Sequence, residues 1–122
     1  MFGEILLVED DNEVRNLIIE KLREAGFEHT VYETSDPMSA LDVFHAHKDK
    51  ISVVICDYYL PIQNGNDLCK IIKSGHPEVN IICLTGDSSV TGNEKDNGID
   101  EVFYKPSGID EAINRALRLS VK

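Results

Sequence analysis

Basic residues are scarce in this sequence. Of its 122 residues, 12 are Lys or Arg and 22 are Asp or Glu, which gives a formal net charge of −10. Nonspecific binding to nucleic acids or to anionic membranes depends on clustered Lys and Arg side chains, so the composition argues against both kinds of partner. An acidic excess commonly serves solubility, and it also suits a site that concentrates a cation.

Long apolar runs and paired cysteines are absent as well. No run approaches the 18 apolar residues of a membrane-spanning helix, and the opening MFGEILLVEDD has no basic stretch of the kind that begins a signal peptide. Cys56, Cys69 and Cys83 share no CxxC spacing and lie in apolar runs, so we expect buried thiols in a reducing compartment. These absences predict a cytoplasmic protein without membrane insertion.

Repeats, low-complexity tracts and linkers are also missing, so residues 1–122 are predicted to form a single domain. A hydrophobic content of 42% suffices for a core that needs no disulfides or metal. Short apolar runs alternate with segments whose apolar residues recur every three or four positions, which predicts alternating strands and helices. Strands are expected at 4–8, 29–34, 51–56, 79–85 and 101–104.

The expected helices have recognisable ends. Gly26 is typical of the residue that follows a helix, and either Ser35 or Asp36 is expected to cap the next helix, which has Pro37 in its first turn. The segment from 87 to 98 has little apolar content and is expected to form only a short or frayed helix. Apolar stripes place the four clearer helices around 14–22, 37–44, 68–72 and 109–117.

Strands that are apolar throughout and alternate with helices predict an α/β fold. The sheet is expected to be parallel, five-stranded and doubly wound, with helices on both faces. In such a sheet the carboxyl ends of all strands meet at one edge, where ligands bind. The polar residues that follow the strands would therefore gather there; they are Glu9, Asp10, Asp11, Asp57, Thr85 and Lys105.

Three clustered carboxylates need a counter-charge. Glu9, Asp10 and Asp57 would repel one another by roughly 4 kcal/mol per pair at 4 Å and an effective dielectric constant near 20. Such a cluster either has a raised pKa or binds a cation, and ligands that are all oxygen favour Mg²⁺. Lys105 can offset the remaining charge, and Thr85 can donate a hydrogen bond to a phosphoryl group on Asp57.

Each of these residues also has an ordinary structural explanation. An Asp after a strand is commonly a turn former or helix cap, and acids before a helix commonly match its dipole. Lys-Pro at a strand end commonly has no special role. Their joint placement at four strand ends of one sheet is much harder to explain in this way.

The motifs together resemble the receiver domain of two-component response regulators, over essentially the whole chain. The stretch "ILLVEDD" is similar to the first strand of that family with its acidic pair, and "VVICDYYLPIQNG" to the phosphoacceptor strand and loop. "IICLTG" is similar to the strand that bears the hydroxyl, and "FYKP" to the lysine followed by a cis proline. The resemblance implies a flavodoxin-like sheet with strand order 2-1-3-4-5.

The resemblance also implies a role for each site residue. Asp57 would be the phosphoacceptor, assisted by Thr85 and Lys105. Mg²⁺ would be the cofactor, with Glu9, Asp10, Asp57 and the backbone carbonyl of Tyr59 as the metal site. The phosphodonor would be a histidine kinase or a phosphotransfer protein. Output would pass to a downstream protein through the face near the fourth and fifth strands.

The chain departs from the family pattern on the side expected to carry output. Val102 stands where receivers commonly have a switch aromatic, and strand alternation directs Phe103 to the opposite face. The stretch 85–105 is a residue or two shorter than usual, and Ser107 and Gly108 replace the usual aromatic after the proline. These departures leave the phosphoryl chemistry intact and affect the expected output mechanism.

Two alternative functions remain open at this stage. One is a degenerate receiver that acts only as a binding module. The other is a phosphatase with an aspartate nucleophile, although such enzymes carry a second acid at the position of Tyr59. A receiver assists its own phosphorylation and dephosphorylation and is not a turnover enzyme on other substrates. The Tyr59 side chain would lie over the site and obstruct a hydrolytic water, or simply lie on the surface.

Overall fold

The computed structural model describes residues 3–60, 65–87, 89 and 98–121. Strands and helices alternate along the chain up to β4, and most of the segment between β4 and β5 lies outside the described residues. The strands are β1 (Glu4–Val8), β2 (Val31–Thr34), β3 (Ile51–Asp57), β4 (Asn80–Thr85) and β5 (Glu101–Tyr104). The helices are α1 (Asn12–Glu24), α2 (Pro37–His47), α3 (Gly65–Gly75) and α4 (Ile109–Leu119).

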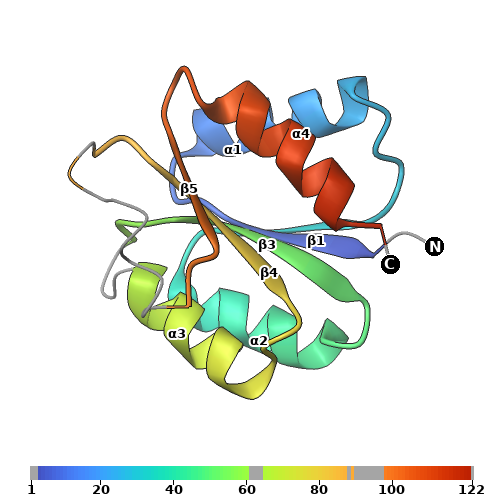
Figure 1. Ribbon diagram of the computed structural model, residues 1–122, viewed down its shortest axis with the longest axis vertical. Coiled ribbons are helices and arrows are strands. Elements are labelled where there is room, and N and C mark those ends of the chain that lie inside the picture. The colour runs from blue at the N-terminus through green and yellow to red at the C-terminus, as the bar shows by residue number, and fades with distance from the viewer. Residues whose placement is uncertain (1–2, 61–64, 88, 90–97, 122) are drawn as a thin grey trace.

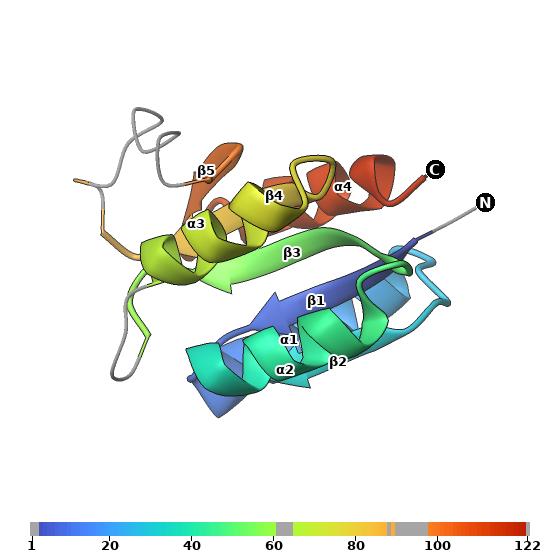
Figure 2. The same cartoon turned by 90° about the horizontal axis from the view of Figure 1, so that it is seen from below.

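The five strands form one parallel sheet in the order β2-β1-β3-β4-β5. Helices α1 and α4 cover one face, and α2 and α3 cover the other (Figures 1 and 2). In Figure 2 the arrows of β1 and β3 point away from the start of β1 and the end of α4, so the carboxyl edge of the sheet lies on the opposite side of the molecule. The predicted doubly wound fold and its strand order are confirmed.

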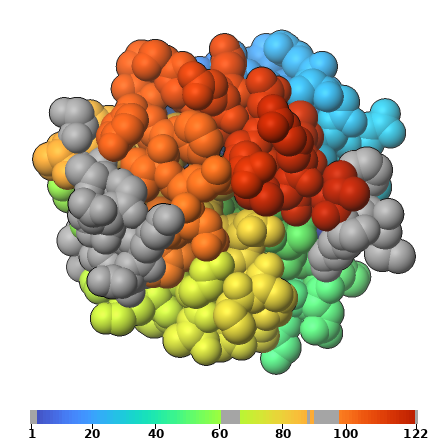
Figure 3. All heavy atoms as spheres, in the orientation of Figure 1, coloured from blue at the N-terminus to red at the C-terminus, as the bar shows by residue number. Residues whose placement is uncertain are grey.

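The central strands are apolar at successive positions because both of their faces are buried. On β3, Val54 and Cys56 pack in the cluster under α2 and α3, while Val53 and Ile55 pack in the cluster under α1 and α4. No disulfide joins the three cysteines, and all three are buried, as predicted. The space-filling view shows β5 and the residues leading into α4 (orange) at the surface between α4 and α3 (Figure 3).

Helix ends follow the local sequence signals. Asp36, and not Ser35, is the N-cap of α2, where its side chain accepts a hydrogen bond from the backbone N–H of Ser39. Gly26 follows α1 with a φ of +95°, the left-handed conformation that glycine adopts most easily. No helix within the described ranges is long and apolar enough to cross a membrane.

Three strand boundaries differ from the predicted ones. β2 begins at Val31 rather than at His29, because the carbonyl groups of Phe27 and His29 instead accept hydrogen bonds from the Arg23 guanidinium, each at 2.7 Å. β3 extends one residue further, to Asp57, and β4 begins one residue later, at Asn80. The short helix predicted within 87–98 falls almost entirely outside the described residues.

Candidate functional site

Three carboxylates meet at the carboxyl ends of β1 and β3. One oxygen from each of Glu9, Asp10 and Asp57 lies within 4.8 Å of the other two. The strands are direct neighbours, with Val8 paired to Cys56, so the residues that follow these two come together at the sheet edge. Glu9 is 2% exposed and the Asp57 side chain 12%, whereas Asp10 is exposed. Three of the acids that the sequence assigned to this edge, Glu9, Asp10 and Asp57, therefore form one cluster.

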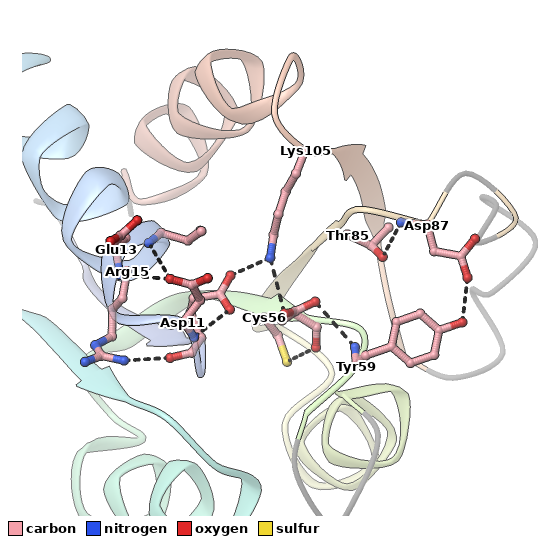
Figure 4. Close-up of polar contacts among 11 residues, drawn as sticks. Asp11, Glu13, Arg15, Cys56, Tyr59, Thr85, Asp87 and Lys105 are labelled. Atoms are coloured by element: carbon pink, nitrogen blue, oxygen red, sulfur yellow. Dashed lines mark hydrogen bonds and ion pairs between the residues drawn. The ribbon is translucent and has the colours of Figure 1, made fainter.

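Lys105 supplies a positive charge to this cluster. It follows β5 and precedes a cis peptide bond to Pro106, and its backbone N–H donates to the Thr85 carbonyl at 2.8 Å. Its Nζ lies 2.6 Å from Glu9 Oε1 and 3.2 Å from Asp57 Oδ2 (Figure 4). The side chain is only 18% exposed, less than its place at a strand end suggested.

Electrostatics in the cluster are unbalanced, because three carboxylates lie together and a single ammonium pairs with two of them. Burial raises the pKa of Glu9 from 4.5 to about 7, which the hydrogen bond from Lys105 opposes and the negative charge of Asp57 reinforces. Burial lowers the pKa of Lys105, but its hydrogen bond to Glu9 and the charge of Asp57 outweigh burial and hold that pKa above its ordinary value. A bound cation would relieve the excess of negative charge.

Asp11, the third acid in the run after β1, is a helix cap. Its Oδ1 accepts hydrogen bonds from the backbone N–H groups of Glu13 at 2.9 Å and Val14 at 3.2 Å (Figure 4). The ordinary structural explanation therefore holds for Asp11. Sequence reasoning missed Arg15, whose Nη1 donates to the Glu9 carbonyl at 2.9 Å. Arg15 lies six residues after Glu9, within α1, and no sequence pattern marks its contact with a backbone carbonyl.

The β3 and β4 ends are joined by a second set of contacts. Thr85 is fully buried, and its Oγ1 accepts a hydrogen bond from the Asp87 backbone N–H at 3.1 Å. The Tyr59 hydroxyl donates to Asp87 Oδ2 at 2.7 Å, and the Tyr59 backbone N–H faces Asp57 Oδ1 at 3.4 Å. The hydrogen bond from Tyr59, followed by those from Ser89, lowers the pKa of the Asp87 carboxyl. Asp87 was not among the predicted site residues.

The departures expected on β5 are visible in its packing. Val102 contacts the cluster under α2 and α3, and Phe103 contacts the cluster under α1 and α4, so the predicted alternation is correct. Gly108 has a close neighbour, because a Cβ at this position would lie 2.6 Å from the Tyr104 carbonyl oxygen. The turn into α4 therefore leaves no room for a side chain at position 108.

Residues 5–117 match the family described as the response regulator receiver domain. The chain belongs to this family. Receiver domains are signalling modules, so membership counts against the alternative of a phosphatase that turns over other substrates. The acidic cluster at the carboxyl edge fits the site at which a receiver accepts its phosphoryl group.

Individual receiver proteins resemble the chain over nearly its whole length. It is 34% identical to the transcriptional regulatory protein CpxR of Escherichia coli, over 93% of this chain and 47% of CpxR. It is 26% identical to the response regulator receiver protein CpdR of Brucella abortus, over 96% of both chains. A putative response regulator from Chloroflexus aurantiacus superposes with a TM-score of 0.83 at 26% identity, covering 100% of both chains. The chain spans about half the length of several curated relatives that it matches.

Proposed function

We propose that Asp57 accepts a phosphoryl group from the phosphohistidine of a histidine kinase or a phosphotransfer protein. The observation that carries the proposal is the cluster of Glu9, Asp10 and Asp57 at the carboxyl edge, in which Lys105 pairs with Glu9 and Asp57. Lys105 touches both Glu9 and Asp57, so one ammonium offsets part of the charge of two carboxylates. An isolated structural ion pair would need only one of these acids.

In the proposed reaction an oxygen of Asp57 attacks phosphorus. The new O–P bond forms as the P–N bond of phosphohistidine breaks, and the departing imidazole nitrogen takes up a proton. The chain contributes position and charge, which are the main terms in phosphoryl transfer. The Lys105 ammonium already lies at Asp57 Oδ2, and the Thr85 hydroxyl hydrogen remains available because its oxygen is the acceptor in the bond from Asp87.

The donor set at the edge fits Mg²⁺. All three side chains offer oxygen and no His or Cys joins the group, which suits a hard cation. Asp10 and Asp57 would hold the ion together with the Tyr59 backbone carbonyl, and the buried Glu9 would add negative charge beside it. When bound, Mg²⁺ supplies positive charge that neutralises phosphoryl oxygens.

Output is proposed to pass by protein contacts through the face near β4 and β5. β5 is the last strand of the sheet and Tyr104 is 36% exposed on it, so this side offers side chains to a partner (Figure 3). The net charge of −10 supports a protein target rather than direct nucleic-acid contact. Residues 1–122 are proposed to act as one cytoplasmic receiver domain, since the two core clusters include residues from β1 through α4.

Intact mass tests the proposal directly. Incubation with Mg²⁺ and acetyl phosphate should raise the mass of the parent by one phosphoryl group, and Asp57→Asn should abolish the gain. Asp42→Asn is the matched control, because it removes an exposed carboxylate from α2 and should be phosphorylated like the parent. A parent that gains no mass would favour the binding-module alternative, and equal phosphorylation of Asp57→Asn would identify another acceptor.

A further inference from the structure

Tyr59 and Asp87 join two loops beside the phosphoryl site. Tyr59 follows β3 by two residues and Asp87 follows β4 by two, and the hydroxyl-to-carboxylate bond between them is 2.7 Å long. Figure 4 shows the Tyr59 ring pointing toward Asp87, with Thr85 nearby. Half of the Tyr59 surface is exposed, so the hydroxyl forgoes part of its hydration to make this bond.

The bond closes a chain of contacts between the acceptor and the buried hydroxyl. From Asp57 the chain runs through the Tyr59 backbone N–H, then from the Tyr59 hydroxyl to the Asp87 carboxylate. It returns through the Asp87 backbone N–H to Thr85 Oγ1. Ser89 adds two hydrogen bonds to Asp87 Oδ1, at 2.9 Å from its N–H and 2.7 Å from its hydroxyl, which hold this carboxylate from the other side.

We propose that Tyr59 and Asp87 are a positioning pair that holds Thr85 in the arrangement of the unphosphorylated protein, and that their hydrogen bond opens when Asp57 is phosphorylated. This inference rests on the proposed function. Tyr59 and Asp87 act through Thr85 and the loops, and neither needs to touch the phosphoryl group. The pair offers a route from the site to the surface that does not require an aromatic at Val102.

Charge opposes the pair once the phosphoryl group arrives. A phosphoryl group carries a charge of about −1.5 to −2 and repels the Asp87 carboxylate at the same edge. Thr85 must also turn its hydroxyl toward the new oxygens. This turn moves Thr85 Oγ1 away from the Asp87 backbone N–H that donates to it. Phosphorylation and the Tyr59–Asp87 bond therefore disfavour each other, and by linkage removing the bond must favour the phosphorylated arrangement.

Affinity for beryllium fluoride in the presence of Mg²⁺ measures this coupling, because beryllium fluoride bound to an aspartate imitates the phosphoryl group. Tyr59→Phe removes only the hydroxyl and should bind beryllium fluoride about threefold to tenfold more tightly than the parent, the range expected for one exposed hydrogen bond. Asp87→Ala should bind beryllium fluoride at least as tightly as Tyr59→Phe does, and therefore more tightly than the parent. In the Asp87→Ala background, Tyr59→Phe should have no further effect, because its partner is already gone.

Tyr32→Phe is the matched control. It removes a similar hydroxyl-to-carboxylate bond, 2.5 Å from Glu4 Oε1 at the amino end of β1, and should leave the affinity unchanged. Unchanged or weaker binding by Tyr59→Phe, or an equal effect of Tyr59→Phe with and without the Asp87 side chain, would overturn the proposal. If Tyr59→Phe does not fold, Asp87→Ala decides alone, and an affinity equal to that of the parent refutes the pair.

Amide spectra of the protein without phosphodonor separate this inference from the proposed function. The Asp87 amide resonance should shift in Tyr59→Phe, with a smaller shift at Thr85, and neither should shift in Tyr32→Phe. Failure of the proposed function would appear as a parent that binds no beryllium fluoride and gains no phosphoryl mass, whatever the amides show. An Asp87 amide that does not move would refute the pair even in a parent that is fully phosphorylated.

Discussion

Two lysines, Lys73 and Lys105, are nearly equally buried and have opposite surroundings. The side chain of Lys73 is 22% exposed and that of Lys105 is 18% exposed. Each makes an ion pair 2.6 Å long, Lys73 with Asp100 and Lys105 with Glu9. Burial and bond length therefore do not distinguish them. The difference lies in the balance of charge around each ammonium.

The surroundings of Lys73 are balanced. Its Nζ lies 2.5 Å from the Val79 carbonyl and 2.6 Å from Asp100 Oδ2, and the same Asp100 oxygen accepts from the Ile81 N–H at 2.8 Å. One cation and one anion share neutral partners, which ties α3 to the starts of β4 and β5. This arrangement is complete without a ligand and is typical of a structural contact.

The surroundings of Lys105 are not balanced. It pairs with two members, Glu9 and Asp57, of a cluster of three carboxylates. Burial of the most protected member, Glu9, raises the pKa of that group to about 7. The comparison teaches that a lysine in an ion pair marks a functional site only when the charges around it fail to cancel. A site with excess negative charge favours the binding of a cation, while a site whose charges cancel needs no ligand.

Replacing Lys105 with alanine should impair phosphorylation, and replacing Lys73 with alanine should reduce stability. Lys105→Ala should lose nearly all phosphorylation by acetyl phosphate and keep a Tm within a few degrees of the parent, because Glu9 can take up a proton when its partner is gone. Lys73→Ala should be phosphorylated at the rate of the parent but lose about 1–2 kcal/mol of unfolding free energy, through the broken contacts of a charged donor. Rates come from intact mass, and stabilities from urea unfolding.

Each lysine variant serves as the control for the other. A Lys105→Ala protein that is strongly destabilised yet still phosphorylated would show that Lys105 is a structural contact like Lys73. A Lys73→Ala protein that is as stable as the parent but is not phosphorylated would contradict the structural role of Lys73.

Asp10→Ala and Asp11→Ala test whether adjacent acids differ as the geometry indicates. Asp10 belongs to the carboxylate cluster, so Asp10→Ala should weaken Mg²⁺ binding by about tenfold or more, in the range of a lost charged contact. Asp11→Ala should keep the affinity within about twofold and lose about 1 kcal/mol of stability, the usual value of a helix cap. Calorimetric titration with Mg²⁺ and urea unfolding give the two quantities. Equal Mg²⁺ affinities in the two variants would contradict the metal assignment.

The smallest expected effect is the stabilisation of the parent by Mg²⁺. At a concentration about tenfold above its Kd, the ion should add about 1.4 kcal/mol and raise the Tm by about 5 °C. The increase should be present in Lys73→Ala and absent in Asp10→Ala, because only the unbalanced edge binds the ion. Differential scanning calorimetry checks this, with Ca²⁺-free buffers as a precaution. An equal increase in Asp10→Ala would place the ion elsewhere.

The sequence by itself determined the layers of the fold and the edge that carries the site. Apolar residues at successive positions of β3 require cover on both faces, and alternation with helices requires parallel strands. Parallel strands all end at the same edge, so Glu9, Asp10, Asp57 and Lys105 had to lie along that edge. This conclusion depends only on the direction in which each strand runs.

Only the tertiary structure decided what each side chain does at that edge. In the run of three acids, Asp11 turned away to cap α1, while Glu9 became buried against Lys105. A side-chain hydrogen bond joins Tyr59 to Asp87, 28 residues further along the chain, and no local sequence pattern predicts it. Such choices depend on strand register and on side-chain rotamers. Both are set by neighbours that are distant in the chain. For that reason the sequence predicted which residues lie at the carboxyl edge of the sheet but not which side chains contact one another there.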